Sequence, residues 1–275
     1  MNGQRVTILG CGGSRGVPVI GLGWGACDPA NPRNRRMRPS ILVEWEHGQG
    51  IGPEAGQGGR LESAVSVLVD TSPDLRQQLL NADVRRVDAV LWTHQHADHA
   101  HGIDELRELC RAMHAPIDAY GRAEDLAELE RRFAYCFDPL RPGDPFYRPV
   151  LTPHAVEGPF TVRGHRIVPF EQDHGYLKTL GYRFDDFAYS TDVVRLDDAA
   201  FAALEGVEVW VVDCARIEPP HPVHAHLALT LEWIARVRPK RAYLTHMDQT
   251  MDYDTLRRLL PTGVEPAYDG LVIEL

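Results

Sequence analysis

Short apolar segments rich in β-branched residues, each bounded by Gly, Pro or Asp, recur along the whole chain. They predict strands at Val6–Leu9, Ile41–Trp45, Val65–Val69, Ala89–Trp92, Ile117–Tyr120, Arg166–Phe170, Tyr182–Phe184, Val209–Val212, Ala242–Thr245 and Leu271–Glu274. Apolar residues at helical spacing predict helices between them, at Pro73–Asn81, Ile103–Met113, Arg122–Phe133, Asp197–Leu204, Leu227–Val237 and Asp254–Leu260. Because strands and helices alternate in two successive groups, the pattern indicates an α/β fold whose sheets are covered by helices on their outer faces.

Two segments interrupt this pattern. Gly48–Gly59 is a low-complexity stretch between two predicted strands, and we interpret it as a flexible hairpin tip and not as a domain boundary. No long linker divides the chain, so we expect one domain over residues 1–275. The dense basic run Arg33–Arg38 is predicted to be a solvated loop more readily than a phosphate site.

The composition limits the classes of function. The chain has 275 residues, 44% of them hydrophobic and 25% charged, which is typical of a globular protein. Its formal charge of −10 disfavours an extended nucleic-acid surface. No run approaches the roughly 18–20 apolar residues that cross a bilayer, and the apolar part of the first residues is too short for a signal peptide.

The five cysteines are scattered and form no Cys-x-x-Cys pair. This spacing argues against a disulfide framework and against a zinc site built from cysteines. Together with the absence of a membrane or export signal, it favours a cytoplasmic location.

The segment His94-Gln95-His96-Ala97-Asp98-His99 carries the strongest chemical signal. It directly follows the predicted strand Ala89–Trp92, where the chain turns at the end of a rigid element. Three imidazoles and a carboxylate within six residues are typical metal ligands. The sequence therefore predicts a metal site at this strand end.

Three further candidate ligands follow later strands. His174 comes after the strand that ends at Phe170, Asp192 follows a short apolar run, and His246 ends the strand Ala242–Thr245. Each residue alone would more often be a helix cap or a surface histidine. Together with the first segment, in this order, they form one set.

This order, H-x-H-x-D-H followed by a separate His, an Asp and a final His, resembles the metallo-β-lactamase fold superfamily over nearly the whole chain. The resemblance implies a four-layer αββα sandwich, with two mixed sheets flanked by helices and two divalent ions at one edge. The ligands it implies are His94, His96 and His174 for one ion, Asp98, His99 and His246 for the other, and Asp192 bridging the two. Asp70 matches the carboxylate that orients a ligand histidine in this family, although it could also cap the helix ahead of Pro73.

Other residues resemble one group within the superfamily. The loop Gly10–Pro18 is similar to the opening of the PhnP-like phosphoribosyl cyclic phosphate phosphodiesterases. In that group a histidine at the position of His224 faces the substrate phosphate, whereas His226 would begin the following helix. Arg15 and the backbone amides of Gly12–Gly16, Gly13 among them, are candidate substrate contacts, although an arginine in a glycine loop more often faces solvent.

The chain departs from this group at one site. Many PhnP-like proteins hold a structural zinc, whose ligands would here fall on Leu22, Trp24, Cys27 and Gln249. Only the cysteine fits, so we expect no structural zinc and expect the loop Gly21–Arg38 to be held by packing, with Trp24 as the candidate contact.

The resemblance implies a metal-dependent hydrolase of a small phosphodiester, such as a cyclic ribose or nucleotide phosphate, in which metal-activated hydroxide attacks phosphorus. Asp98 would orient or deprotonate that nucleophile, and His224 would stabilise charge or protonate the leaving oxygen. The two ions could be Mn²⁺ or Zn²⁺. The expected partner is a small molecule, with no extended nucleic acid and no membrane, and a homodimer is compatible with the sequence.

Three alternatives stay open. The ligand order also fits a tRNA 3′-end endonuclease, which the acidic charge disfavours. The same metals could hydrolyse a thioester or a lactone. The third alternative is a non-catalytic metal-binding accessory protein in cofactor biosynthesis.

Overall fold

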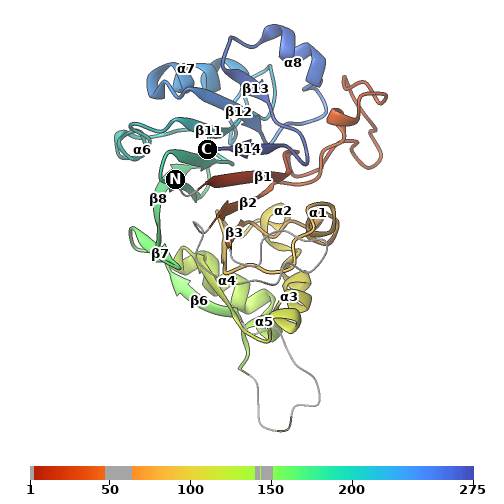
Figure 1. Ribbon diagram of the computed structural model, residues 1–275. Helices are drawn as coiled ribbons and strands as arrows, with labels where there is room; N and C mark the ends of the chain where they lie inside the picture. The colour runs from red at the N-terminus through yellow and green to blue at the C-terminus, as the bar shows by residue number, and fades with distance from the viewer. Residues whose placement is uncertain (1–2, 47–63, 140–142, 144–150) are drawn as a thin grey trace.

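Two β-sheets lie face to face, with helices on the outside of each (Figure 1). The computed structural model describes residues 3–46, 64–139, 143 and 151–275. In these residues the first sheet has the order β14-β1-β2-β3-β4-β5-β6, with β1 at Gln4–Gly10, β2 at Ser40–Trp45, β3 at Val65–Val69, β4 at Ala89–Leu91, β5 at Ile117–Gly121, β6 at Leu151–Ala155 and β14 at Val272–Glu274. The predicted hairpin tip Gly48–Gly59 lies outside the described residues.

The second sheet has the order β13-β12-β11-β10-β9-β8-β7. Its strands are β7 (Phe160–Val162), β8 (His165–Asp173), β9 (Lys178–Phe184), β10 (Phe187–Ser190), β11 (Val209–Asp213), β12 (Arg241–Thr245) and β13 (Val264–Pro266). Both sheets contain parallel and antiparallel neighbours, as the resemblance implied. The helices are α1 (Leu75–Asn81), α2 (Ala97–Ala100), α3 (Leu106–Met113), α4 (Ala123–Arg132), α5 (Ala134–Phe137), α6 (Asp198–Ala203), α7 (Leu227–Val237) and α8 (Tyr253–Leu259), with 3₁₀ turns η1 (Pro32–Asn34) and η2 (Ile103–Glu105).

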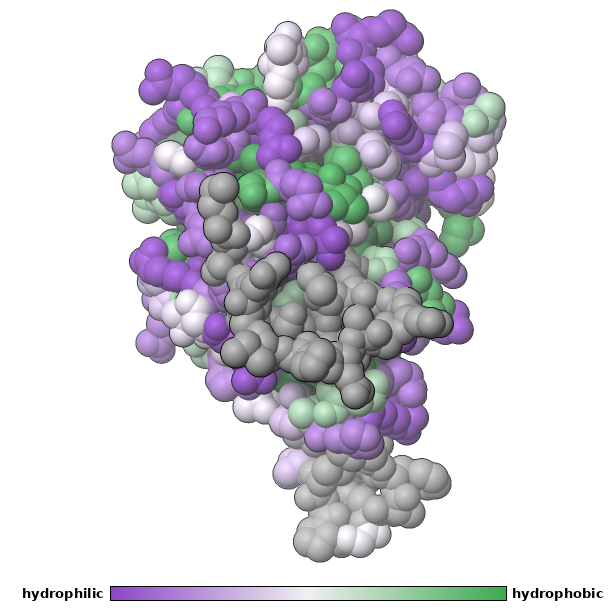
Figure 2. Space-filling view, viewed as in Figure 1, coloured by the Kyte–Doolittle hydropathy of each residue, from purple (hydrophilic) through white to green (hydrophobic). Residues whose placement is uncertain are grey.

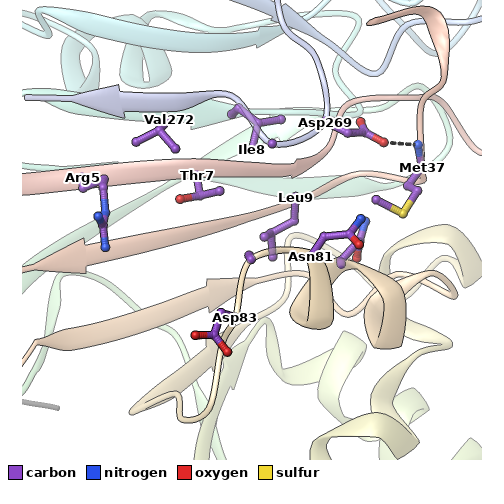
Figure 3. A pocket seen from close by; sticks show the side chains of 12 residues that line it. Arg5, Thr7, Ile8, Leu9, Met37, Asn81, Asp83, Asp269 and Val272 are labelled. Atoms are coloured by element: carbon purple, nitrogen blue, oxygen red, sulfur yellow. Dashed lines mark hydrogen bonds between the residues drawn. The ribbon is translucent and has the colours of Figure 1, made fainter. Parts of the chain in front are cut away.

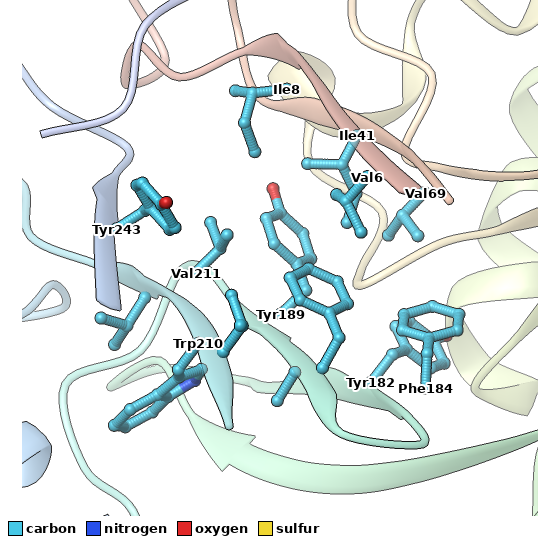
Figure 4. Close-up of a cluster of buried hydrophobic side chains, with 14 of the residues drawn as sticks. Val6, Ile8, Ile41, Val69, Tyr182, Phe184, Tyr189, Trp210, Val211 and Tyr243 are labelled. Atoms are coloured by element: carbon cyan, nitrogen blue, oxygen red, sulfur yellow. The ribbon is translucent and has the colours of Figure 1, made fainter. Parts of the chain in front are cut away.

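The alternation of side chains along the strands builds the layers. In β2, Ile41 and Val43 belong to the core between the sheets, while Leu42 belongs to the layer beneath the helices of the first sheet. Figure 4 shows the inner core, where Val6, Ile8, Ile41 and Val69 face aromatic side chains of the second sheet. Helices α1, α3 and α4 add leucines to the outer layer of the first sheet, and α6, α7 and α8 cover the second. The predicted four-layer αββα sandwich is confirmed.

The sequence pattern missed four strands and two helices. Strands β6, β7 and β13 lie at sheet edges, where β6 carries Pro153 and β13 carries Pro266, and a strand with proline is tolerated mainly at an edge. Strand β10 appeared only as an apolar run, because four residues show no clear period. Helices α2 and α5 have four residues each, too few for a helical repeat to be visible.

Polar residues dominate the visible face of the molecule, with hydrophobic ones gathered mainly in the upper half of the view (Figure 2). Within the described residues, no helix combines the length and the apolar character needed to cross a membrane. All five cysteines are buried thiols.

Candidate metal centre

Strand ends from both sheets bring the predicted ligands together. His94 and His96 follow β4, Asp98 and His99 lie in α2, and the remaining three residues follow strands of the second sheet: His174 after β8, Asp192 after β10 and His246 after β12. The backbone links the sheets here, since the amide of Leu180 in β9 donates to the carbonyl of Thr93 at 2.9 Å. The predicted ligands therefore form one cluster at the junction of the two sheets.

The donor atoms of these residues form two groups that share Asp192. His94, His96 and His174, here called the His94 group, offer donors within 4.8 Å of one another and of Asp192. Asp98, His99 and His246, the His246 group, do the same on its other side. The structure thus assembles the two ligand sets that the resemblance implied.

The two carboxylate oxygens of Asp192 face different groups. Its Oδ1 lies 3.5 Å from Nε2 of His174 and 3.9 Å from Nε2 of His94. Its Oδ2 lies 2.9 Å from Nε2 of His99 and 3.2 Å from Nε2 of His246. One carboxylate placed in this way could bridge two cations.

Three of the histidine rings are anchored by their Nδ1 atoms. Nδ1 of His99 lies 2.7 Å from Oδ2 of Asp70, Nδ1 of His174 lies 2.7 Å from the carbonyl oxygen of Val223, and Nδ1 of His94 lies 3.0 Å from Oγ1 of Thr93. These contacts leave Nε2 of each ring directed at Asp192. Partners of this kind orient histidines that bind metals.

Several of the Nε2 atoms have no hydrogen-bond partner although they are buried. This is the case for His94, His99 and His246. Buried polar atoms are normally satisfied, and three unsatisfied imidazole nitrogens around a carboxylate are the arrangement expected of ligands to a cation. The donor set, imidazoles with carboxylates, suits a divalent transition metal. The residues therefore fit divalent metal ions.

Burial and charge set the protonation of the cluster. Burial lowers the pKa values of His94, His96 and His174, so these imidazoles stay neutral, as metal ligands must. Burial alone would raise the pKa of Asp192, but the neighbouring His246 and His99 hold it well below its usual range. The His94 group is thus neutral, next to an ionised carboxylate.

The His246 group behaves differently. Burial would lower the pKa of His99, but Asp192, Asp98 and Asp70 raise it well above its usual value. Burial would also lower the pKa of His246, but the negative charge of Asp192 outweighs burial, and the pKa of His246 is raised to about 9. Protons on these two rings balance the carboxylate charge, and a divalent cation would displace them.

Asp70 serves this site and does not cap a helix. Its Oδ1 accepts a hydrogen bond from the amide of Thr93 at 2.8 Å, its Oδ2 contacts His99, and its side chain is fully buried. The N-cap position of α1 belongs to Asp74 instead. The structure therefore supports the first of the two interpretations of Asp70.

Three residues of the cluster adopt left-handed backbone conformations. Asp70, Asp192 and His246 have φ values of 63°, 53° and 59°, and each lies just beyond a strand. Such conformations cost on the order of 1–3 kcal/mol at non-glycine residues and are concentrated at functional sites. Sequence patterns did not reveal this strain.

His224 lies beside the cluster and is held by a buried carboxylate. Its Nδ1 lies 3.2 Å from Oδ2 of Asp213, and its ring stacks on His246 with centroids 4.6 Å apart. Asp213 ends β11 and is fully buried. Sequence analysis did not assign a role to Asp213, although an aspartate directly after the predicted strand Val209–Val212, which is rich in β-branched residues, was a usable signal. His226 is the N-cap of α7, as expected.

A cavity of about 250 Å³ opens next to His224 and His246. The candidate substrate contacts Gly13 and Arg15 line it, and so do Arg216 and His221, which the sequence did not single out. Arg216 pairs with Asp248 at 3.6 Å, and Arg15 donates to Gln249 at 3.3 Å. Two arginines, together with the carboxylate of Asp248, therefore line a cavity that borders the donor residue His246.

The basic run Arg33–Arg38 is only partly the solvated loop that was predicted: Arg33 and Arg35 are exposed, but the prediction was wrong for Arg36. Arg36 is 2% exposed and donates to the carbonyl oxygens of Met251 at 2.6 Å and Asp248 at 3.3 Å, and its Nη1 lies 3.7 Å from Sγ of Cys27. The guanidinium of Arg33 lies over the rings of Tyr253 and Tyr268. These contacts tie the orange loop of Figure 1 to the C-terminal part of the chain.

Trp24 contributes less to this loop than expected. Its ring is half-buried and stacks beneath Arg35 at 5.1 Å, whereas Leu22 is 66% exposed. Cys27 contacts the carbonyl of Gln249 at 3.5 Å. The buried guanidinium of Arg36 therefore joins the two segments more tightly than the indole does.

Comparison with known proteins agrees with this geometry. The profile of the β-lactamase superfamily domain matches residues 66–247. The chain belongs to the β-lactamase superfamily. Within it, a diphosphatase of the PhnP family is 30% identical and has a TM-score of 0.84, with 99% of this chain and 98% of that one covered. The resemblance to PhnP-like proteins is thereby confirmed, and the chain is a metal-dependent hydrolase in general terms.

More distant relatives vary in function. Zn²⁺-bound PqqB from Methylobacterium extorquens (18% identity, TM-score 0.76, 98% and 100% of the chains) and the short form of human tRNase Z (16%, 0.66, 98% of each) share the fold. An octanoyltransferase of Porphyromonas gingivalis is 29% identical over 271 residues, which are 98% of this chain and 51% of that protein. The chain therefore spans about half the length of this curated relative.

Proposed function

We propose that the protein hydrolyses a small phosphodiester, such as a cyclic ribose or nucleotide phosphate, with the help of two divalent ions, Mn²⁺ or Zn²⁺. The observation that carries the proposal is the shared carboxylate of Asp192, whose two oxygens face two separate groups of donors. Divalent cations held there would supply positive charge to phosphoryl oxygens and lower the pKa of water. The diphosphatase activity named for the PhnP-family relative supports chemistry at phosphorus.

The residues around the cluster have distinct tasks in this proposal. Asp98, whose pKa lies well below its usual range because nearby His99 outweighs the effect of burial, orients the attacking water as an ionised acceptor. His224, held through Nδ1 by Asp213, uses Nε2 to donate a proton or a hydrogen bond to the leaving oxygen. Arg15 and Arg216 attract the anionic substrate into the cavity.

The test is a substrate panel with the metal content measured in the same sample. It contains ribose cyclic phosphates, 2′,3′- and 3′,5′-cyclic nucleotides, bis(p-nitrophenyl) phosphate and a dinucleoside diphosphate. We expect turnover of a cyclic or unhindered diester by protein that carries metal. If metal-loaded protein hydrolyses only the dinucleoside diphosphate, the substrate is a phosphoanhydride and not a phosphodiester. Inactivity on every phosphate would refute the proposal.

His224→Ala tests the assignment of the proton donor. We expect turnover to fall by about 10²–10⁴-fold, the range for general acid catalysis, with an unchanged metal content. His154→Ala is the control, because this half-exposed histidine pairs with Asp118 at 2.8 Å, away from the cavity. Normal turnover of His224→Ala would show that His224 has no catalytic role.

A second candidate function is hydrolysis of an acyl thioester or ester. It is favoured by the relative named an octanoyltransferase, since this chain matches about half of that protein. An octanoyl thioester and a p-nitrophenyl ester in the same panel separate the two candidates. Preferred cleavage of the thioester, lost on metal removal, would favour the second.

A further inference from the structure

One glutamine lies between the first two donor histidines and is held from outside the site. The backbone carbonyl of Gln95 accepts a hydrogen bond from Nη1 of Arg132 at 2.9 Å, and its side-chain Oε1 accepts one from Nη2 at 2.8 Å. Burial raises the pKa of the Asp125 carboxyl to about 6, and the backbone amide of Gln95 is among the groups that oppose this rise. Both Arg132 and Asp125 belong to α4. Through Arg132, this helix therefore holds both the backbone carbonyl and the side chain of Gln95, directly between His94 and His96.

Arg132 is itself fixed on the helix. Its Nε donates to Oε1 of Glu128 at 2.7 Å, one turn earlier. Glu128 also accepts from Arg131, and these two arginines lower its pKa to about 2, so it stays ionised at neutral pH. A guanidinium that is braced at Nε and binds two oxygens through its planar fork has little freedom to move.

The other end of the same helix reaches the hairpin that carries His174. Nη1 of Arg122, the N-cap residue of α4, donates to the carbonyl of Lys178 at 2.6 Å. Lys178 pairs with Asp173 across β8 and β9, directly beside His174. A helix of ten residues is a rigid rod about 15 Å long, so α4 fixes the spacing between these two segments.

We infer that Arg132 is a positioning residue for the His94 group, and that α4 sets the distance between the His94–His96 segment and the His174 hairpin. This group needs such a brace because His94 and His96 lie in an extended segment that belongs to no helix or strand. Asp98 and His99 lie instead within α2, and Asp70 orients His99. Loss of Arg132 should therefore lower the affinity of the His94 group for its ion. The affinity of the His246 group for its ion should not change.

The inference rests on the metal centre proposed above and is independent of the substrate. Apo protein is titrated with Zn²⁺ against a competing chelator, so that the stoichiometry and the two affinities are measured without any activity assay. We expect wild type to bind two ions, and Arg132→Ala to bind one of them about 10-fold or more weaker, as for other residues that support metal ligands. Arg132→Lys, which can restore one of the two bonds, should recover part of the loss.

Arg131→Ala is a matched control. Arg131 is the neighbouring residue, binds the same Glu128 and does not contact Gln95. The inference would be overturned if Arg131→Ala and Arg132→Ala bound Zn²⁺ with equal affinities, or if Arg132→Ala lost affinity equally at both ion sites. Neither result would contradict the metal centre itself. Failure of wild type to bind any ion would overturn the proposed metal centre as well. Thermal unfolding of the apo variants separates a general loss of stability from selective loss of one ion.

Discussion

Replacing Asp70 by asparagine tests how the site controls its histidines. The asparagine oxygen can still accept the hydrogen bond that the Thr93 amide now makes at 2.8 Å. Its amide nitrogen would replace Oδ2, which lies 2.7 Å from Nδ1 of His99. Because that nitrogen is a donor, it favours the tautomer of His99 with the proton on Nε2, the atom that faces Asp192. The variant therefore blocks a ligand atom without changing the size of the side chain.

The magnitude follows from this single altered contact. Loss of the partner that orients a metal-binding histidine typically lowers affinity 10–100-fold, which corresponds to about 1.4–2.8 kcal/mol. We expect this loss for the ion of the His246 group only, since Asp70 does not contact His94, His96 or His174. The assay is Zn²⁺ titration of the apo protein against a chelator, with the two affinities fitted separately.

Asp88→Asn is the control for this experiment. Asp88 is also a buried aspartate that accepts a backbone hydrogen bond, from Ser66 at 3.0 Å, but it precedes β4 and lies at the opposite end of that strand from the donors. It should lower stability without changing metal affinity. Wild-type affinity in Asp70→Asn would refute the argument that Asp70 sets the tautomer of His99.

Two further predictions concern residues outside the donor set. Asp269 lies in a second cavity of about 440 Å³ beside β1 and β14, where burial raises its pKa to about 7 despite hydrogen bonds from the amides of Met37 and Cys11 (Figure 3). The folded chain then binds this proton more tightly than the unfolded chain, so the free energy of unfolding should fall as the pH rises from about 4 through about 7. Urea unfolding of the apo protein at several pH values should show a smaller fall in the free energy of unfolding for Asp269→Asn than for wild type. The same pH dependence in both proteins would contradict the raised pKa of Asp269. Gly175→Ala should weaken metal binding, because φ is +82° and the new Cβ would lie 2.7 Å from Cγ1 of Val223, whose carbonyl anchors His174. Gly164→Ala is the control, because Gly164 also has a positive φ but a Cβ added there meets no atom within 4 Å. If both variants lowered metal affinity equally, the contact with Val223 would not be the cause.

Alternating strands and ligand order could be predicted because both are local. The period of two along β2 directs Ile41 inward and Leu42 outward, and the same rule applies in any sheet. The carboxylates that orient histidines were harder to find. Asp213 and His224 are 11 residues apart and Asp70 and His99 are 29 apart, so no local pattern links them; the family resemblance pointed to Asp70, and only the fold shows that Asp213 touches His224.

The arginines show where charge patterns misled the prediction. Arg36 belongs to a basic run that suggested a solvated loop, yet its guanidinium is buried against backbone carbonyls. Arg132 lies within the predicted helix Arg122–Phe133 and no pattern singled it out, but it holds the segment between two donor histidines. In both cases the partner is a backbone oxygen, and sequence patterns carry no information about which carbonyl a long side chain will reach.

The charge of the cluster connects metal binding with substrate binding. Asp98 and Asp192 have pKa values well below their usual range, while those of His99 and His246 are raised, so the metal-free cluster balances carboxylates with protons. Each divalent cation that displaces one of these protons adds one net positive charge beside the cavity of Arg15 and Arg216. An acidic chain can in this way attract an anion, and its affinity for that anion should depend on how fully the cluster is loaded with metal.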